Sequence, residues 1–200
     1  HAMPRVVVVP ETRAEVAAVV RLCAEYGVPL VTRGAGTGLS GGALPLVDGC
    51  LLSLARFNRI LAIDTANRTA TVEPGVRNLA ISEAVAPYGL YYAPDPSSQI
   101  ACTIGGNVAE NSGGVHCLKY GLTVHNVIEV EILTMEGEWM TLGGRGLDAP
   151  GLDLLALMHG SEGLLGIVMQ VTVKLLPRPQ LARVVLAAFD SVDAAGAAVA

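Results

Sequence analysis

The sequence Arg33-Gly-Ala-Gly-Thr-Gly-Leu-Ser-Gly-Gly42 lies between two apolar runs, residues 28–32 and 51–54. It holds five glycines in ten residues. Because glycine has no Cβ, such a stretch can adopt positive φ and approach a ligand closely. Successive free N–H groups in such a turn form a concave surface that suits phosphate oxygens. A flexible linker is the alternative, but the apolar runs on both sides predict ordered strands and favour a phosphate-binding loop.

The residues after the glycines decide which type of phosphate loop this is. Gly36-Thr-Gly-Leu-Ser-Gly41 matches the dinucleotide fingerprint G-x-G-x-x-G, which requires a following helix. Pro45 disfavours a helix interior because it lacks an N–H donor, and Gly49 precedes the next apolar run. No Lys-Ser or Lys-Thr pair follows, which excludes a P-loop. The sequence therefore predicts a phosphate loop that joins strand to strand, not a Rossmann turn.

Composition excludes several function classes. The 200 residues are 52% hydrophobic and 16% charged, which predicts a packed globular interior. The net charge of −5, the scattered Lys and Arg and the 4% of aromatic residues argue against a nucleic-acid partner. No apolar run approaches the ~20 residues of a membrane span. Cys23, Cys50, Cys102 and Cys117 are far apart and favour free thiols in a reducing, cytoplasmic compartment over disulfides or a metal site.

The first part of the chain predicts a βαβ unit. Strands at 6–9 and 28–32 flank a helix that begins with Thr12 and Glu15 at capping-box spacing and ends at Gly27. Further strands are expected at 51–54, 60–64 and 69–73, the last two as a hairpin, and a helix is expected at 76–86.

Later segments predict a second hairpin, a short helix, a long strand and an unfinished helix. The hairpin pairs 127–133 with 138–141, the helix spans 152–158, and residues 167–176 alternate as a strand. A strand at 181–189 and a helix from Val192, capped by Asp190 and Ser191, follow without a stop signal before Ala200. The sequence thus indicates the front part of a longer protein. His1-Ala-Met3 is typical of a tag remnant and is left out of the fold prediction.

Two more glycine-containing stretches resemble the first in composition. Thr103-Ile-Gly-Gly-Asn-Val-Ala-Glu-Asn-Ser-Gly-Gly114 has four glycines and two asparagines, and predicts an ordered functional loop. His159-Gly-Ser-Glu-Gly-Leu-Leu-Gly166 predicts a turn that leads into the strand at 167–176.

With these stretches together, the chain resembles the p-cresol methylhydroxylase/vanillyl-alcohol oxidase superfamily of FAD-dependent oxidoreductases. It is most similar to the group of bacterial glycolate oxidase FAD subunits and D-lactate dehydrogenases. The resemblance covers residues 10 to 179. It is carried by the three glycine stretches together with Pro94-Asp-Pro-Ser-Ser98 and His116-Cys-Leu-Lys-Tyr-Gly121.

The resemblance implies an α+β fold of two α/β subdomains that enclose FAD. One has a small βαβ-type sheet, and the other has a larger mixed or antiparallel sheet with flanking helices. The implied FAD-binding domain spans residues 4–179, with subdomains at about 4–73 and 74–179. Residues 180–200 would begin a C-terminal substrate domain.

The resemblance also implies which residues hold the cofactor. The pyrophosphate would lie on the first glycine stretch, and the opposite wall would come from residues 94–98 and 105–114. Residues 162–168 would meet the adenosine end or the backbone next to the flavin. The implied cofactor-binding residues are Gly34, Ala35, Gly36, Thr37, Gly38, Leu39, Gly42, Pro94, Asp95, Ser98, Gly105, Gly106, Ala109, Asn111, Ser112, Gly114, Glu162, Gly163, Ile167 and Val168.

Several members of the family attach FAD covalently through a His just after the first glycines. Leu39-Ser-Gly-Gly-Ala43 has none, so non-covalent FAD is expected. The implied reaction takes hydride from the α carbon of a small 2-hydroxy acid, with the base and the metal-binding residues largely in the C-terminal domain. Companion electron-transfer subunits, which would hold the protein peripherally at the inner membrane, are also implied.

Several residues keep alternative interpretations. His116, His125 and His159 fit structural hydrogen bonding better than catalysis, and Arg33 either balances the phosphate charge or is a solvated strand end. Glu162 suits a ribose contact better than a carboxylate pair with Glu110. Two other functions remain open: a reductase like UDP-N-acetylmuramate dehydrogenase, and a nucleotide-binding module without a redox role.

Overall fold

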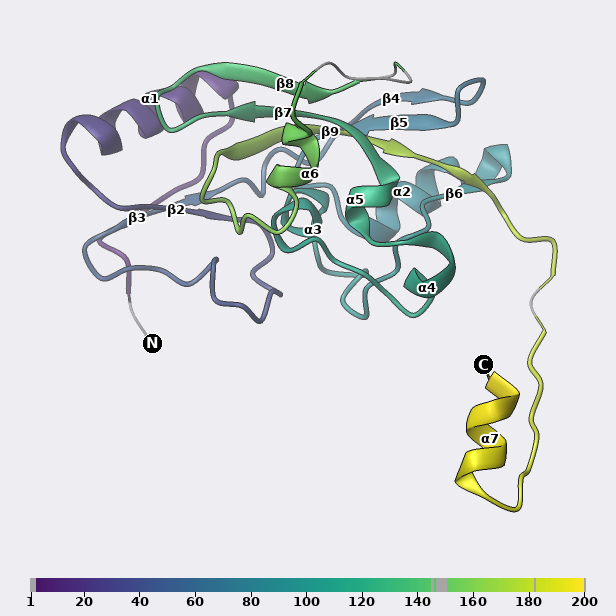
Figure 1. Cartoon of the computed structure of the whole chain (residues 1–200). Coiled ribbons are helices and arrows are strands. Elements are labelled where there is room, and N and C mark those ends of the chain that lie inside the picture. Colours follow the sequence, from purple (N-terminus) through teal and green to yellow (C-terminus); the bar gives the residue numbers. More distant parts are fainter. Residues whose placement is uncertain (1–2, 145, 147–150, 182, 200) are drawn as a thin grey trace.

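The computed structural model describes residues 3–144, 146, 151–181 and 183–199. His1 and Ala2, and with them most of the expected tag remnant, lie outside the described residues. The described chain forms a three-stranded sheet, a five-stranded sheet and a two-stranded pair, with helices between and beside them (Figure 1).

The small sheet is parallel and has the order β1-β3-β2. Its strands are β1 (Val6–Val8), β2 (Leu30–Arg33) and β3 (Cys50–Ser53), and α1 (Arg13–Glu25) connects the first two. The predicted βαβ unit is confirmed, with β3 inserted between its two strands.

Helix α1 begins and ends where the sequence predicts. The Thr12 side chain accepts a hydrogen bond from the Glu15 amide, and the Glu15 carboxylate accepts one from the Thr12 amide, which completes the capping box. Gly27 follows the helix with φ +61°, in the left-handed region where glycine is unstrained. The helix buries Val16 and Val20 against Leu52 of β3 and against the larger sheet, so it lies between the two sheets.

The larger sheet is antiparallel and has the order β4-β5-β9-β7-β8. Its strands are β4 (Ile60–Asp64), β5 (Thr69–Val72), β7 (Val127–Leu133), β8 (Trp139–Gly143) and β9 (Ile167–Lys174). Both predicted hairpins are confirmed. The expected α+β class, with a small βαβ sheet and a larger antiparallel one, is also confirmed, and the fold is not a Rossmann fold.

The sheets divide earlier in the chain than the subdomain boundary expected near residue 73. The small sheet ends at Ser53, whereas the hairpin of β4 and β5 belongs to the larger sheet. The local sequence pattern predicts the hairpin but not the strand that pairs with its other edge. That strand is β9, about a hundred residues further along, and it pairs with the backbone groups that β5 leaves free.

Strand β9 is buried on both faces, although its sequence predicted simple alternation. Ile167 and Met169 pack with α1 in one hydrophobic core, whereas Val168, Val171 and Val173 belong to a second, separate core. The reason is its central position between β5 and β7, with helices covering both faces.

The second core lies under α2 (Asn78–Val85) and α3 (Ile104–Glu110). Shorter elements complete this side: the 3₁₀ helix η1 (Ala86–Tyr88), β6 (Leu90–Tyr91) paired with β10 (Leu176–Pro177), α4 (Cys117–Tyr120), α5 (Thr123–Asn126) and α6 (Leu154–Met158).

The stretch Thr103–Gly114 is not the ordered loop that the sequence predicted, because α3 occupies most of it. Its glycines suggested a loop since each costs up to about 1 kcal/mol in a helix. Close packing overrides this cost: a Cβ on Gly105 would lie 2.7 Å from Cβ of Pro74, so glycine lets the helix approach that segment. The helix ends at Asn111, which adopts a left-handed conformation with φ 49°.

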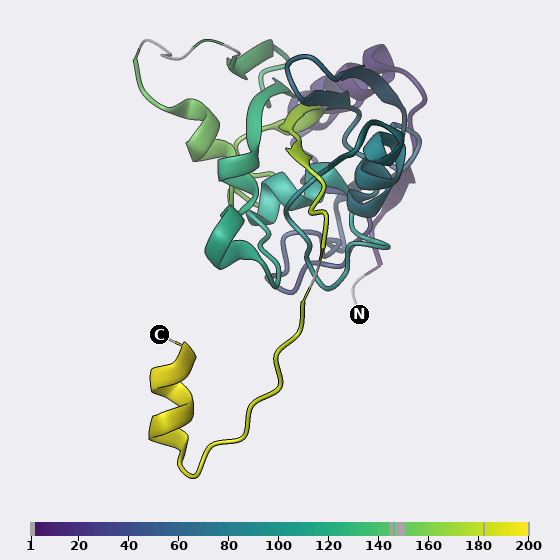
Figure 2. The same ribbon diagram turned by 90° about the vertical axis from the view of Figure 1, so that its right-hand side faces the viewer.

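The predicted strand at 181–189 does not form among the described residues of that segment. Leu181, Val184 and Leu186 are largely exposed, and no strand of the described chain lies alongside to pair with the backbone. The predicted helix beyond it is present as α7 (Val192–Val199), with Ser191 Oγ accepting from the Ala194 amide. Two views at right angles show α7 standing apart from the sheets (Figures 1 and 2).

Candidate functional site

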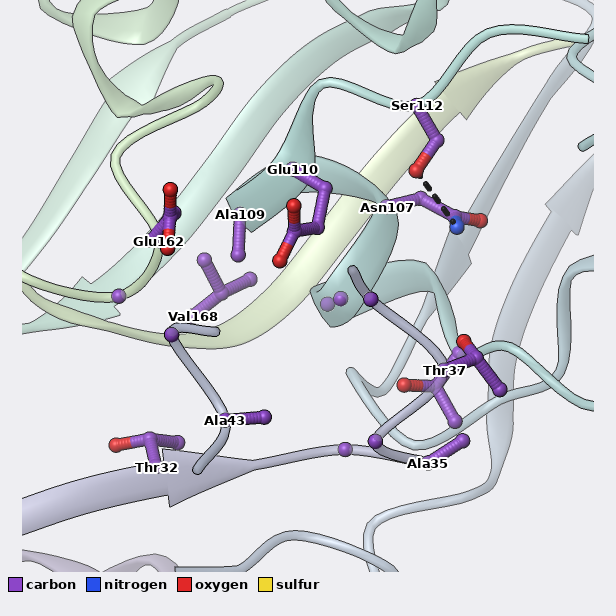
Figure 3. Close-up of a pocket in the computed structure, with 18 of the residues that line it drawn as sticks. Thr32, Ala35, Thr37, Ala43, Asn107, Ala109, Glu110, Ser112, Glu162 and Val168 are labelled. Carbon is purple, nitrogen blue, oxygen red and sulfur yellow. Dashed lines mark hydrogen bonds between the residues drawn. The ribbon is translucent and has the colours of Figure 1, made fainter. Parts of the chain in front are cut away.

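One cleft in the described chain has a volume of about 340 Å³, within the range typical of small-molecule sites. One wall is the glycine loop, residues 34–42, which follows β2. The opposite wall is α3 together with the turn at 161–163 and the start of β9 (Figure 3). Three segments far apart in sequence therefore meet around one cavity.

Most of the expected cofactor-binding residues line this cavity. They are Gly34, Ala35, Gly36, Thr37, Gly38, Leu39, Gly42, Ser98, Gly105, Gly106, Ala109, Ser112, Glu162, Gly163, Ile167 and Val168. The structure adds residues that the sequence did not single out as contacts: Thr32, Ser40, Ala43, Leu54, Pro74, Ser97, Thr103, Asn107, Glu110, Ser161 and Gly166.

Four expected residues do not line the cavity, namely Pro94, Asp95, Asn111 and Gly114. Asp95 instead accepts a hydrogen bond of 2.6 Å from Nδ1 of His116, and Gly114 packs directly against Asp95. The Asn111 side-chain oxygen accepts from the Val124 amide at 3.0 Å. The polar groups of Asp95 and Asn111 therefore bond to neighbouring segments of the chain and not to the cavity.

The glycine loop presents unpaired backbone amides. Within the described part of the chain, no amide of residues 34–42 donates a hydrogen bond to a protein acceptor. Gly36 and Gly41 have φ values of +71° and +104°, which only glycine adopts easily. Such a series of free donors fits the oxygens of a phosphate group.

Two carboxylates reach from the opposite wall toward this loop. Glu110, at the end of α3, accepts a 2.8 Å hydrogen bond from Ser40 Oγ. A Cβ on Gly38 would lie 2.6 Å from a Glu110 oxygen, and one on Gly42 would lie 2.6 Å from a Glu162 oxygen. Glycines at these positions therefore keep space for the two acidic side chains, which flank Ala109 in Figure 3.

Two buried hydroxyls at the cavity have no hydrogen-bond partner among the described residues. They belong to Thr103 and Ser161. Thr103 is only 8% exposed and occupies the N-cap of α3, yet its hydroxyl makes no capping bond and lies against Gly34. Buried polar groups are almost always paired, so these two hydroxyls fit hydrogen bonds to a bound molecule. Sequence reasoning missed them because residue type does not reveal side-chain direction.

A buried amide network holds α3 in place. Asn107 Oδ1 accepts a 2.9 Å hydrogen bond from Nδ2 of Asn78, and both side chains are 2% exposed. Asn107 Nδ2 donates to Cys102 Sγ and to Ser112 Oγ, each at 3.3 Å (Figure 3). The turn at 160–162 is tied to the same helix, since the Gly160 and Glu162 amides donate to carbonyls of Val108 and Ala109. These hydrogen bonds fix α3 and the turn relative to one another.

The histidine and cysteine side chains considered next make contacts within the protein. Burial lowers the pKa of His159, whose Nδ1 is 2.7 Å from the Leu155 carbonyl oxygen. His125 Nδ1 accepts from the Leu122 amide. All four cysteines are free, and burial followed by contact with Cys23 raises the pKa of Cys50 to about 11. The described residues contain no group of three His, Cys, Asp or Glu side chains that could hold a metal ion.

Comparison with known proteins identifies the family. A family model described as "FAD binding domain" matches residues 4–143. The chain is 65% identical over 196 residues to glycolate oxidase subunit GlcD of Escherichia coli (strain K12), which covers 98% of this chain and 39% of that protein. It is 45% identical to the protein of the same name from Bacillus subtilis (strain 168), over 98% of this chain and 42% of the relative. Identity to D-lactate dehydrogenase of Anaerostipes hadrus is 41%, over 90% of this chain and 38% of that protein.

A solved structure agrees with this result. Alkyldihydroxyacetonephosphate synthase superposes with a TM-score of 0.75 at 28% identity, covering 88% of this chain and 34% of that one. The chain spans about two fifths of the length of the three curated relatives named in the preceding paragraph. Its cofactor is FAD, and the chain belongs to the FAD-binding domain family.

Proposed function

We propose that this chain is the FAD-binding part of a flavin-dependent 2-hydroxy-acid oxidoreductase of the glycolate oxidase or D-lactate dehydrogenase type. The observation that carries the proposal is the cavity. A loop with free amides faces two unpaired buried hydroxyls and two carboxylates, which suits a ligand with phosphates and sugar hydroxyls. The names of the similar proteins support the substrate class.

The chain's own residues would bind and orient the cofactor. The amides of residues 34–42 would hold the pyrophosphate, and Thr103 and Ser161 would complete its hydrogen bonds. Glu162 would accept from ribose hydroxyls, as carboxylates do in other dinucleotide sites. When bound, the flavin supplies the acceptor for the hydride from the substrate α carbon. None of the described residues is assigned a catalytic role.

We further propose that FAD is held without a covalent bond, since no His or Cys lines the cavity among the described residues. Denaturing the flavin-loaded protein and filtering it should release all yellow colour into the filtrate. Colour that stays with the protein would contradict this part of the proposal.

The domain organisation is also a proposal. Residues 4–179 would form the FAD-binding domain, and residues 180–200 would begin a substrate domain. No helix in the described residues is long and apolar enough to cross a membrane. We also propose companion electron-transfer subunits and a cytoplasmic, membrane-peripheral location. The name of the relatives, glycolate oxidase subunit, supports membership of a complex.

Anaerobic addition of glycolate or D-lactate to the full-length, FAD-loaded protein tests the activity. We expect the flavin absorbance to bleach with one of these acids, and we expect the 200-residue chain alone to bind FAD weakly without turnover. Bleaching by NADPH and not by either acid would favour a UDP-N-acetylmuramate-dehydrogenase-like reductase. Protein that stays colourless after FAD is added would favour a nucleotide-binding module without a redox role.

A further inference from the structure

The cavity lacks a positive side chain for the negative ligand it would hold. Its lining residues, within the described chain, include no Lys, Arg or His, but they include Glu110 and Glu162. A pyrophosphate bridge adds two further negative charges. Backbone amides contribute only partial charges, so a neighbouring cation is expected where the phosphates bind.

Arg33 is placed to be that cation. It is the last residue of β2 and directly precedes the glycine loop. Its guanidinium packs against Gly36, where a Cβ would lie 2.7 Å from Arg33 Nε and 2.8 Å from its Cζ. Glycine at position 36, with φ +71°, thus lets the charged group lie flat against the loop backbone.

The Arg33 side chain is unpaired among the described residues. It forms no ion pair and no hydrogen bond with any described residue. It is also half-buried, so its charge is less well solvated than that of a fully exposed arginine. This separates Arg33 from Arg59, which is committed to Glu73 at 2.7 Å.

We propose that Arg33 supplies the positive charge that stabilises the pyrophosphate of FAD, acting across the loop backbone at Gly36. Arg33 does not line the cavity, so the amides of the loop make the direct contacts and Arg33 is a positioning residue. Its charge also offsets the two carboxylates, which would otherwise repel the phosphates. This inference rests on the proposed function, namely that the cavity binds FAD.

The test measures FAD affinity of the full-length protein by flavin fluorescence at low and high NaCl. The variants are Arg33→Gln, which removes the charge, Arg33→Lys, which keeps it, and Arg21→Gln, a control with the same charge change on the exposed surface of α1. We expect Arg33→Gln to weaken FAD binding about tenfold or more at low salt. We also expect the FAD affinity of this variant to depend less on NaCl concentration, because the attraction between Arg33 and the phosphates, which salt screens, is gone.

Each outcome has a defined meaning. Partial recovery in Arg33→Lys and normal binding in Arg21→Gln would support the charge role. If Arg33→Gln binds FAD with wild-type affinity and salt dependence, the inference is wrong. It is also wrong if the affinity loss is equal at low and high salt and is not recovered by lysine, because that pattern reports a structural role. If the wild-type protein binds no FAD at all, the proposed function itself fails.

Discussion

The two long glycine-rich stretches have similar compositions but opposite structures. Residues 34–42 form an open loop with unpaired amides, whereas Thr103 to Gly114 contains helix α3. The difference lies in what each glycine faces. Gly38 faces the end of a movable Glu110 side chain, while Gly105 and Gly114 face the backbone of Pro74 and Asp95. In the first stretch glycine leaves room for a ligand and side chains, and in the second it allows close packing.

The largest effect on stability is expected from Gly105→Ala. Its methyl group would press on Pro74, whose Cβ and carbonyl oxygen would be 2.7 and 3.1 Å away, so α3 must shift. We expect a loss of about 3 kcal/mol in the free energy of unfolding, as measured by urea denaturation. Gly106→Ala is the matched control, since its Cβ would meet only Thr103 Oγ1 at 3.5 Å. It should leave stability unchanged or raise it by up to about 1 kcal/mol. Equal effects of the two variants would remove the packing explanation.

The next largest effect on stability is expected in the amide network of Asn78 and Asn107, which holds α3. Asn107→Ala leaves Asn78 Nδ2 buried without its acceptor. It should lower the free energy of unfolding by about 2 kcal/mol. A thermodynamic cycle with Asn78→Ala checks the reason. The double variant should lose less stability than the sum of the two single variants, because removing both partners leaves no unpaired group. Strict additivity would show that the pair does not interact.

A smaller effect, confined to acidic pH, is expected at His159, which leads into the turn beside α3. Its pKa is lowered mainly by burial, so the unfolded state binds a proton more readily than the native state. The contribution of neutral His159 is therefore fully present above the unfolded pKa of about 6.5 and is lost as pH falls below it. Comparing urea denaturation of wild type and His159→Asn across this range tests the sign. A pH dependence identical in the two proteins would contradict it.

The smallest effect on stability is expected in the open loop. Gly38→Ala would displace only the flexible Glu110 carboxylate, so unfolding free energy should change by less than about 0.5 kcal/mol. FAD binding should nevertheless weaken, because the new methyl group enters the cavity. A large loss of stability would show that the loop is as tightly packed as α3.

The sequence predicted the local structure well where signals were short-range. The capping box at Thr12, the left-handed Gly27 and both hairpins were confirmed. Pro45 correctly excluded a helix after the glycine loop. The sequence also predicted most of the residues that line the cavity, although their role in binding FAD stays a prediction.

Tertiary structure decided what depends on distant neighbours. Glycine content predicted a loop at α3, but packing against Pro74 outweighs the low helix propensity of glycine. The apolar run at 181–189 predicted a strand, yet a strand needs a partner for its backbone, and none lies alongside it in the described chain. Likewise, only three-dimensional packing could show Arg33 against Gly36, Thr103 turned away from its own helix cap, and Glu110 on Ser40. Sequence determines where the backbone can bend and be capped, whereas side-chain direction follows from contacts between segments far apart in the chain.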